Sequence, residues 1–169
     1  MTKVGILSAI ERTPASPVDT TISRVRELYA HLLGHDTATE GLMSWCAACG
    51  LGEGPISAEV YDVQGIRRRD GAIWSRRVML SRGAVLLSCA EIRFRTDALT
   101  SLMLQRLAQG SVPFGAIVKP LRPWRTVTFA SASAGDTILE LHATVRAGTG
   151  LPIARVREAY RRVLIVGGV

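Results

Sequence analysis

The chain has 169 residues and a formal net charge of +7, and 47% of its residues are hydrophobic while 21% are charged. This composition excludes a disordered tail, because there is enough apolar surface for a core, and the length suits one domain over residues 1–169. No apolar run approaches the ~20 residues of a membrane span, and Glu11 and Arg12 interrupt the apolar start too early for a signal peptide. We therefore expect a soluble, cytoplasmic, monomeric protein.

The first half of the chain predicts one helix followed by strands. After an extended segment of about twenty residues, apolar side chains recur at three- and four-residue spacing over residues 18–33, which predicts a helix that Gly34 ends. The segment that begins at residues 36–39 has no clear pattern, and a glycine-rich loop follows it. Alternating apolar residues then predict strands over residues 56–63, 73–80 and 85–95.

The second half of the chain predicts a second amphipathic helix and a hairpin. The helix begins at Thr96 or Asp97, ends at Gly110 and places four apolar side chains on one face: Leu99, Leu102, Met103 and Leu107. An irregular connection follows over residues 113–123, because prolines interrupt it. Residues 137–146 and 153–164 are predicted strands around a turn at residues 147–150. The fold class is therefore α+β, a single antiparallel sheet of about five or six strands with helices packed on one side.

The basic residues are almost all arginines, since Lys3 and Lys119 are the only lysines. The arginines are scattered along the sequence, and the densest run, at residues 67–69, has no aromatic residue between its members. Nucleic-acid-binding surfaces usually combine a basic stripe with stacking aromatic groups. A small anion held by one or two buried arginines therefore fits the sequence better than a nucleic acid, and no membrane partner is expected.

The three cysteines indicate a reducing compartment, because an odd number of them does not form a disulfide framework. Residues 45–49 read W-C-A-A-C, similar to a thioredoxin motif, but no βαβ pattern surrounds them. Cys89 is isolated, and His31 and His35 lack an acidic residue between them, so neither pattern predicts a zinc site. We expect no metal and no redox cofactor.

Three charged side chains share strand faces with apolar ones, because alternate side chains in a strand point to opposite faces. Arg76, Glu158 and Glu91 each align with three apolar residues, respectively Trp74, Val78 and Leu80; Ala154, Val156 and Tyr160; and Val85, Leu87 and Cys89. A charge buried among apolar groups is costly unless it is paired or bound by a ligand. The pattern is compatible with a polar pocket or with a structural ion pair between Arg76 and Glu158.

Four segments in order resemble the chorismate pyruvate-lyase family and cover most of the chain, from residue 36 to residue 164. They are D-T-A-T at residues 36–39, W-S-R-R-V-M-L at 74–80, the helix end with V-P-F-G at 107–115, and the strand containing Glu158 at 152–160. A further A-E pair at residues 90–91 resembles a segment of mycobacterial members of the wider superfamily. No single segment is distinctive, and the ordered set carries the resemblance.

The resemblance implies a role for individual residues. Arg76 matches the family's carboxylate-binding arginine, and Glu158 matches its pocket glutamate. We expect Arg76 to bind the ring carboxylate of the substrate and Glu158 to accept a hydrogen bond from the ring hydroxyl. Backbone amides would contribute at Ala38 and Phe114, where the family's enzymes carry methionine and leucine. Glu91 is a weaker candidate for the pocket wall. Lys119 or Arg122 would bind the second carboxylate of the substrate, because both lie close to Phe114 in the sequence.

The activity implied by the resemblance is the elimination of pyruvate from chorismate to give 4-hydroxybenzoate, within aromatic or secondary metabolism. This reaction needs no metal, nucleotide or redox cofactor, and positioning and electrostatics would supply the catalysis. Two alternatives remain open. The chain could be a non-catalytic small-molecule-binding module, similar to the effector domains of bacterial transcription regulators. It could also be a lyase that acts on a related chorismate-derived substrate or gives another hydroxybenzoate isomer.

Overall fold

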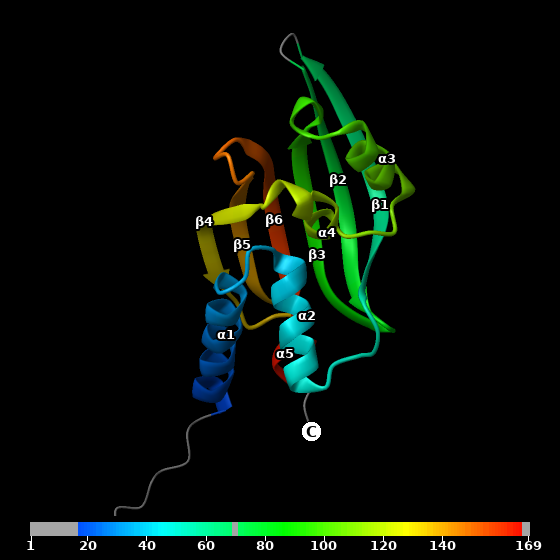
Figure 1. The fold of residues 1–169 in the computed structure, drawn as a ribbon. Coiled ribbons are helices and arrows are strands. Elements are labelled where there is room, and N and C mark those ends of the chain that lie inside the picture. Colours follow the sequence, from blue (N-terminus) through cyan, green and yellow to red (C-terminus); the bar gives the residue numbers. More distant parts are fainter. Residues whose placement is uncertain (1–16, 69–70, 167–169) are drawn as a thin grey trace, which may run out of the picture.

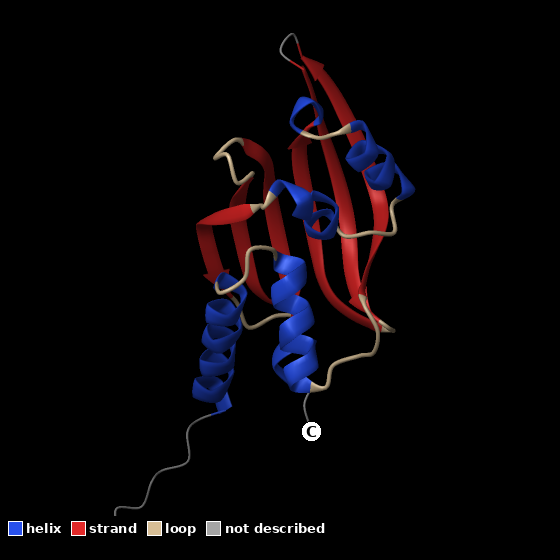
Figure 2. Ribbon diagram, in the orientation of Figure 1, coloured by secondary structure: helices blue, strands red, loops and turns tan. Residues whose placement is uncertain are grey.

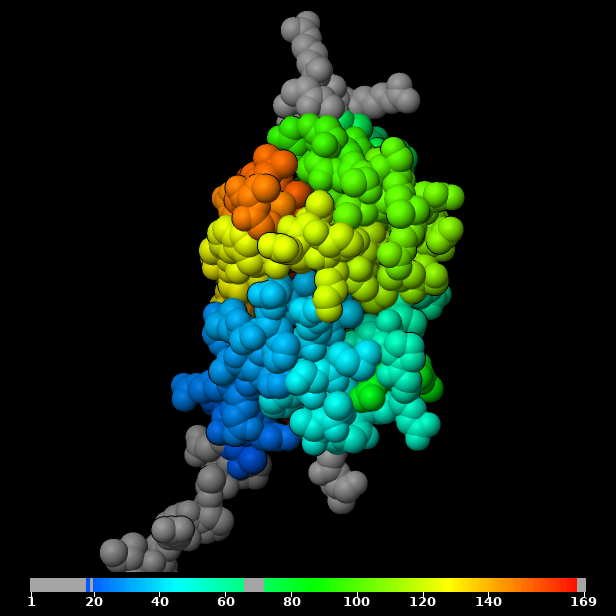
Figure 3. Space-filling model, in the orientation of Figure 1, coloured from blue at the N-terminus to red at the C-terminus, as the bar shows by residue number. Residues whose placement is uncertain are grey.

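The computed structural model describes residues 17–68 and 71–166, and its centre is one six-stranded antiparallel sheet. The strand order is β1-β2-β3-β6-β5-β4, and the helices lie on one face of the sheet (Figures 1 and 2). This arrangement confirms the predicted α+β class. The space-filling view shows that helical segments cover this face over most of its length (Figure 3). None of the described helices is long and apolar enough to cross a membrane.

Two helices begin the described chain. α1 (Pro17–Leu33) confirms the first predicted helix, and its proline occupies the first helical position, where the missing amide hydrogen costs nothing. Most of the expected extended segment lies outside the described residues. The segment without a clear pattern is the start of α2 (Ala38–Cys49), whose N-cap Thr37 accepts a hydrogen bond from the Glu40 amide at 3.2 Å. α2 ends at Gly50, which adopts a left-handed conformation with φ 65°.

The sheet contains the five predicted strands and one that the sequence analysis missed. The predicted ones are β1 (Ile56–Arg68), β2 (Gly71–Arg82), β3 (Val85–Arg95), β5 (Thr137–Arg146) and β6 (Pro152–Arg161). The missed strand is β4 (Trp124–Ala132), which pairs with β5 at the edge of the sheet. Most of its side chains are exposed, so it lacks the apolar alternation that identifies a half-buried strand. The irregular connection predicted over residues 113–123 therefore leads directly into a strand.

Several boundaries in the second half differ from the prediction. α3 (Ser101–Gln109) begins after Thr100, whose hydroxyl accepts a hydrogen bond from the Met103 amide. The predicted start at Thr96 instead lies in a separate 3-10 turn, η1 (Thr96–Ala98). Leu102 is 65% exposed, so it lies off the apolar face that contains Met103. The connection after α3 contains α4 (Phe114–Val118) and η2 (Lys119–Leu121).

The end of the chain turns back toward the helices. β6 ends at Arg161, three residues before the predicted end, and a short helix, α5 (Val163–Val166), follows it. Leu164 is fully buried, and its carbonyl accepts a hydrogen bond from Trp45 of α2 at 2.8 Å. This contact explains why the apolar pattern continues beyond the strand: the side chains pack against α2 and α1 instead of continuing β6.

Strand pairing places the two charges of interest on the helix-covered face. Arg76 lies opposite Ile92 on β3, and Glu158 lies opposite Ala90 on the same strand. Ala90 also pairs with Val78, two residues from Arg76. Arg76 and Glu158 are therefore two strands apart, with backbones separated laterally by roughly 10 Å at the usual strand spacing.

Candidate ligand-binding site

Arg76 and Glu158 line different cavities on the helix-covered face, and the larger of the two surrounds Arg76. It has a volume of about 420 Å³ and lies between β1, β2, β3, the η1 turn and α3. Its walls are mainly apolar and are formed by Val60, Val63, Trp74, Phe94, Leu104, Leu107 and Ala108, with Thr96 and Gly110 adding polar atoms. A cavity of this size with few polar groups is typical of small-molecule sites.

Arg76 is the charged group of this cavity, and it is only 2% exposed, which confirms its predicted inward orientation. Its Nη2 donates a long hydrogen bond of 3.4 Å to the Gly110 carbonyl, whereas Nε and Nη1 are buried without a partner. Burial lowers the pKa of the Arg76 guanidinium, although an arginine stays protonated at neutral pH. The cavity thus contains a positive charge that no described carboxylate neutralises.

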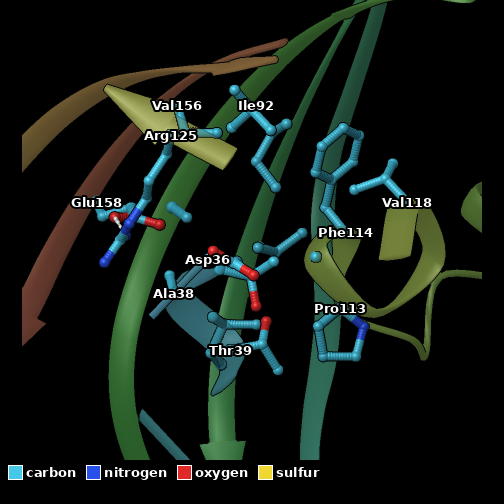
Figure 4. A pocket seen from close by; sticks show the side chains of 16 residues that line it. Asp36, Ala38, Thr39, Ile92, Pro113, Phe114, Val118, Arg125, Val156 and Glu158 are labelled. Atoms are coloured by element: carbon cyan, nitrogen blue, oxygen red, sulfur yellow. Dashed lines mark hydrogen bonds and ion pairs between the residues drawn. The ribbon is translucent and has the colours of Figure 1, made fainter. Parts of the chain in front are cut away.

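The smaller cavity, of about 50 Å³, lies where α2 begins (Figure 4). Glu158 and Arg125 line it from the sheet, and Thr37, Ala38 and Phe114 line it from α2 and α4. Because one water molecule needs about 10–15 Å³ of cavity volume, the cavity has room for a few waters or a compact polar group. A whole chorismate molecule does not fit into this cavity alone.

Glu158 is 7% exposed, as its position on the apolar side of β6 predicts, and it belongs to a buried hydrogen-bonded network. Arg125 Nη1 donates to Glu158 Oε2 at 3.2 Å, and the Tyr160 hydroxyl donates to the same oxygen at 2.8 Å. Arg125 Nη2 also donates to the Leu32 carbonyl at the end of α1. Burial raises the pKa of Glu158, although Arg125 and the Tyr160 hydrogen bond oppose the shift. Burial also raises the pKa of Tyr160.

The structure does not bring Arg76 and Glu158 into one cavity. Phe94 lines the larger cavity and Phe114 the smaller one, and their ring centroids are 5.9 Å apart. This aromatic pair connects the linings of the two cavities. The ion-pair partner of Glu158 is Arg125, which the sequence analysis did not single out because it lies on the unpredicted strand β4.

The remaining predicted site residues divide between the cavity and the surface. Ala38 and Phe114 both line the smaller cavity, as the first residues of α2 and α4. Lys119 does not: its side chain is 71% exposed and forms an ion pair with Glu40 at 2.9 Å. Arg122 is exposed and has a positive φ of 49°. The hydrogen bond with Lys119 lowers the pKa of Glu40.

Glu91 lies on the opposite face of the sheet, which contradicts its expected place in the pocket wall. The pairing of β2 with β3 shifts between Leu80, which faces Ser88, and Ser81, which faces Leu86. Leu87 is therefore an extra residue, a β-bulge that reverses the facing of all later residues on β3. Glu91 instead forms ion pairs with arginines on the outer face.

The cysteine motif is helical. Cys46 and Cys49 lie in the last turn of α2, whereas a reactive thiol of this type needs a helix N-terminus. Cys46 is fully buried, and burial raises its pKa to about 11. Among the described residues, no group of three or more His, Cys, Asp or Glu side chains is arranged to hold a metal ion.

A scan against protein-family models gave no match, and no curated protein sequence matched either. Solved structures are similar in fold. PhnF from Mycobacterium smegmatis aligns over 77% of this chain with a TM-score of 0.53 and 11% identity. The effector domain of PhnF alone aligns over 75% of this chain, with a TM-score of 0.52 and 10% identity. The matched part is 65% of the full PhnF chain but 89% of the effector domain.

A third structure is the ligand-binding domain of a protein described as a GntR-family transcriptional regulator from Bordetella bronchiseptica. It has 14% identity and a TM-score of 0.48, over 65% of this chain and 86% of that one. With TM-scores above 0.5, PhnF and its effector domain show that this chain has a similar fold. At these identities the likeness concerns the fold alone.

Proposed function

We propose that this chain is a ligand-binding domain that holds a small organic anion in the cavity at Arg76. The observation that carries the proposal is the buried guanidinium, 2% exposed, with two hydrogen-bond donors that lack partners. A buried charge without a counter-ion is strongly unfavourable, and a bound carboxylate or phosphate removes that penalty. Arginine binds both groups through two parallel hydrogen bonds.

The cavity walls indicate what the rest of the ligand is like. Apart from Arg76 and Thr96, the lining side chains are apolar, and Trp74 and Phe94 present aromatic surfaces. A compact ring that carries one anionic group matches such a cavity, because the ring is desolvated against the walls while the anion pairs with the arginine. The likeness of the fold to an effector domain supports a binding role without chemistry.

Titration calorimetry with benzoate and 4-hydroxybenzoate tests this proposal. The wild-type protein is expected to bind at least one of the two, and Arg76→Met is expected to lose that binding at least tenfold, since a desolvated charged contact is worth about 1.5–3 kcal/mol. Arg106→Met is the matched control, because Arg106 is an exposed arginine on α3. Equal binding by Arg76→Met and the wild type refutes the assignment.

A second candidate is the elimination of pyruvate from chorismate, which requires Arg76 and Glu158 to act on one molecule. Its support is that both side chains are buried on the same face of the sheet, two strands apart. Incubation with chorismate, followed by assay of pyruvate and 4-hydroxybenzoate, separates the two functions. Stoichiometric formation of both products, lost in Glu158→Ala, establishes the lyase. Binding of 4-hydroxybenzoate without turnover favours the binding module.

A further inference from the structure

The face of the sheet opposite the helices contains an open groove of about 640 Å³ that is rich in arginine. Five arginines line it: Arg77, Arg93, Arg95, Arg146 and Arg155. They come from β2, β3, β6 and β5, which are consecutive in the sheet and together span roughly 14 Å at the usual strand spacing. Two carboxylates, Asp62 and Glu91, also line the groove. Arg95 forms an ion pair with Asp97 beside the groove, so the guanidiniums exceed the carboxylates by two.

The two carboxylates are already shared among the arginines. Glu91 contacts Arg93 at 2.7 Å and Arg77 at 3.6 Å, and Arg77 also contacts Asp62 at 3.6 Å. Arg155 is exposed and has no ion-pair partner within the described part of the chain. The strand register places it directly opposite Arg93. Like charges at directly opposed positions destabilise a sheet, and an anion placed between them relieves the repulsion.

We propose that this groove binds the phosphate backbone of double-stranded nucleic acid without regard to base sequence. The planar guanidinium matches phosphate oxygens through paired hydrogen bonds. Duplex DNA offers one negative charge per ~1.7 Å of its axis, so a strip of roughly 14 Å meets several phosphates. None of the side chains that line the groove is aromatic, and protein interfaces rely on aromatic anchors for much of their affinity. These features favour nucleic acid over an acidic protein.

The arginines of the groove are far apart in the sequence, and only the strand pairing brings them together. This is why the sequence pattern alone favours a small anion over a nucleic acid. The groove is on the face opposite Arg76 and Glu158, so duplex binding is independent of the ligand-binding function proposed above. Its test needs no knowledge of the small-molecule ligand.

Fluorescence anisotropy with two unrelated labelled duplexes of about 20 base pairs measures this binding. Two uncompensated guanidiniums predict a slope of log affinity against log salt of about −1.8, which is a loss of about 12-fold between 50 and 200 mM salt. Both duplexes are expected to bind equally, since phosphate contacts carry no sequence information.

A pair of double variants with the same change in net charge locates the surface. Arg93→Gln/Arg155→Gln is expected to weaken binding at least tenfold and to reduce the salt slope by about 1.8, because two phosphate contacts are removed. Arg26→Gln/Arg106→Gln changes exposed arginines on α1 and α3, and it is expected to bind like the wild type. Circular dichroism confirms that each variant is folded before its affinity is compared.

Three outcomes overturn the proposal. The first is an equal loss of binding in both double variants, because net charge alone would then explain the affinity. The second is no binding to duplex at 50 mM salt, where phosphate contacts are strong. The third is binding of polyglutamate that depends on Arg93 and Arg155 while duplex does not bind, which would assign the groove to an acidic protein.

Discussion

Replacing Arg76 with methionine should make the ligand-free protein more stable. The wild-type side chain is 2% exposed and keeps Nε and Nη1 without partners. Each unsatisfied buried donor costs about 1–3 kcal/mol, and apolar side chains that replace buried charges of similar volume often stabilise proteins by about 1–4 kcal/mol. Methionine is flexible and unbranched, so it follows the path of the arginine stem among the apolar walls of the cavity.

We expect Arg76→Met to raise the free energy of unfolding by about 2 kcal/mol, which is about 4–8 °C in Tm for a domain of this size. Urea titration followed by circular dichroism measures the change, and an unaltered m-value shows that the unfolding transition is comparable. Arg106→Met, at an exposed position, is expected to stay within about 0.5 kcal/mol of the wild type.

Ligand narrows the difference between the two proteins. At a ligand concentration of about 100 times the wild-type Kd, the wild type gains about 2.7 kcal/mol, whereas Arg76→Met with tenfold weaker binding gains about 1.4 kcal/mol. A loss of more than about 1 kcal/mol in ligand-free Arg76→Met would refute the reasoning, because the guanidinium would then be satisfied in the native protein.

Three further predictions concern buried groups. Arg125→Met leaves Glu158 buried without its guanidinium and should cost about 3–5 kcal/mol in urea unfolding at neutral pH. The double variant Arg125→Met/Glu158→Gln should recover at least about 1 kcal/mol of this loss, and strictly additive losses would contradict the pairing. Burial raises the pKa of Glu158 above its usual 4.5, so the folded protein binds a proton at this carboxyl more tightly than the unfolded chain does. The stability that this proton contributes is complete below pH 4.5 and is lost as pH rises through the raised pKa. The difference in unfolding free energy between the wild type and Glu158→Gln should therefore shrink as pH rises. Burial raises the pKa of the Cys46 thiol to about 11, so only about one part in a thousand of it is ionised at pH 8. Iodoacetamide should therefore modify Cys46 only after unfolding, and rapid modification of the native protein would contradict this.

The sequence predicts the direction of Arg76 and Glu158 correctly because strand parity is a local property. Both residues lie in stretches where strand pairing is regular. Side chains there alternate between the two faces of the sheet without interruption, from the neighbouring apolar residues to the charged one. The predicted face of Glu91 is wrong because the bulge at Leu87 lies between Glu91 and the apolar residues at the start of β3 from which its face was predicted. No feature of the sequence around Leu87 predicts this β-bulge.

Two elements of the site are not predictable from apolar periodicity. α2 is buried at Gly41, Leu42, Trp45 and Cys46, and its interior glycine allows close contact with α1: an added Cβ would lie 3.1 Å from Leu32. This close approach depends on α1 and not on any repeat in α2 itself. β4 is an exposed edge strand and leaves no apolar pattern to detect, although it supplies Arg125.

Arg125 changes what Glu158 is able to do. Both hydrogen bonds to the carboxylate, from Arg125 and from Tyr160, fall on Oε2, which leaves Oε1 to accept a hydrogen bond from a ligand in the smaller cavity. A ring hydroxyl of a ligand anchored at Arg76 has to pass from the larger cavity into the smaller one to reach that oxygen.

Phe114 lines the smaller cavity and contacts Phe94 of the larger one, so we expect Phe114→Ala to open a path between the two cavities. We expect the ratio of the affinity for 4-hydroxybenzoate to the affinity for benzoate to be about fivefold to tenfold higher in the variant than in the wild type. The reason is that a hydrogen bond to a charged acceptor is worth about 1.5 kcal/mol, or slightly less when it is partly solvated. Calorimetry with both ligands on both proteins gives the ratio, and Glu158→Gln in the Phe114→Ala background should abolish the gain. An unchanged ratio would show that the ring hydroxyl does not reach Glu158, and Arg76 alone would then account for the recognition of these ligands.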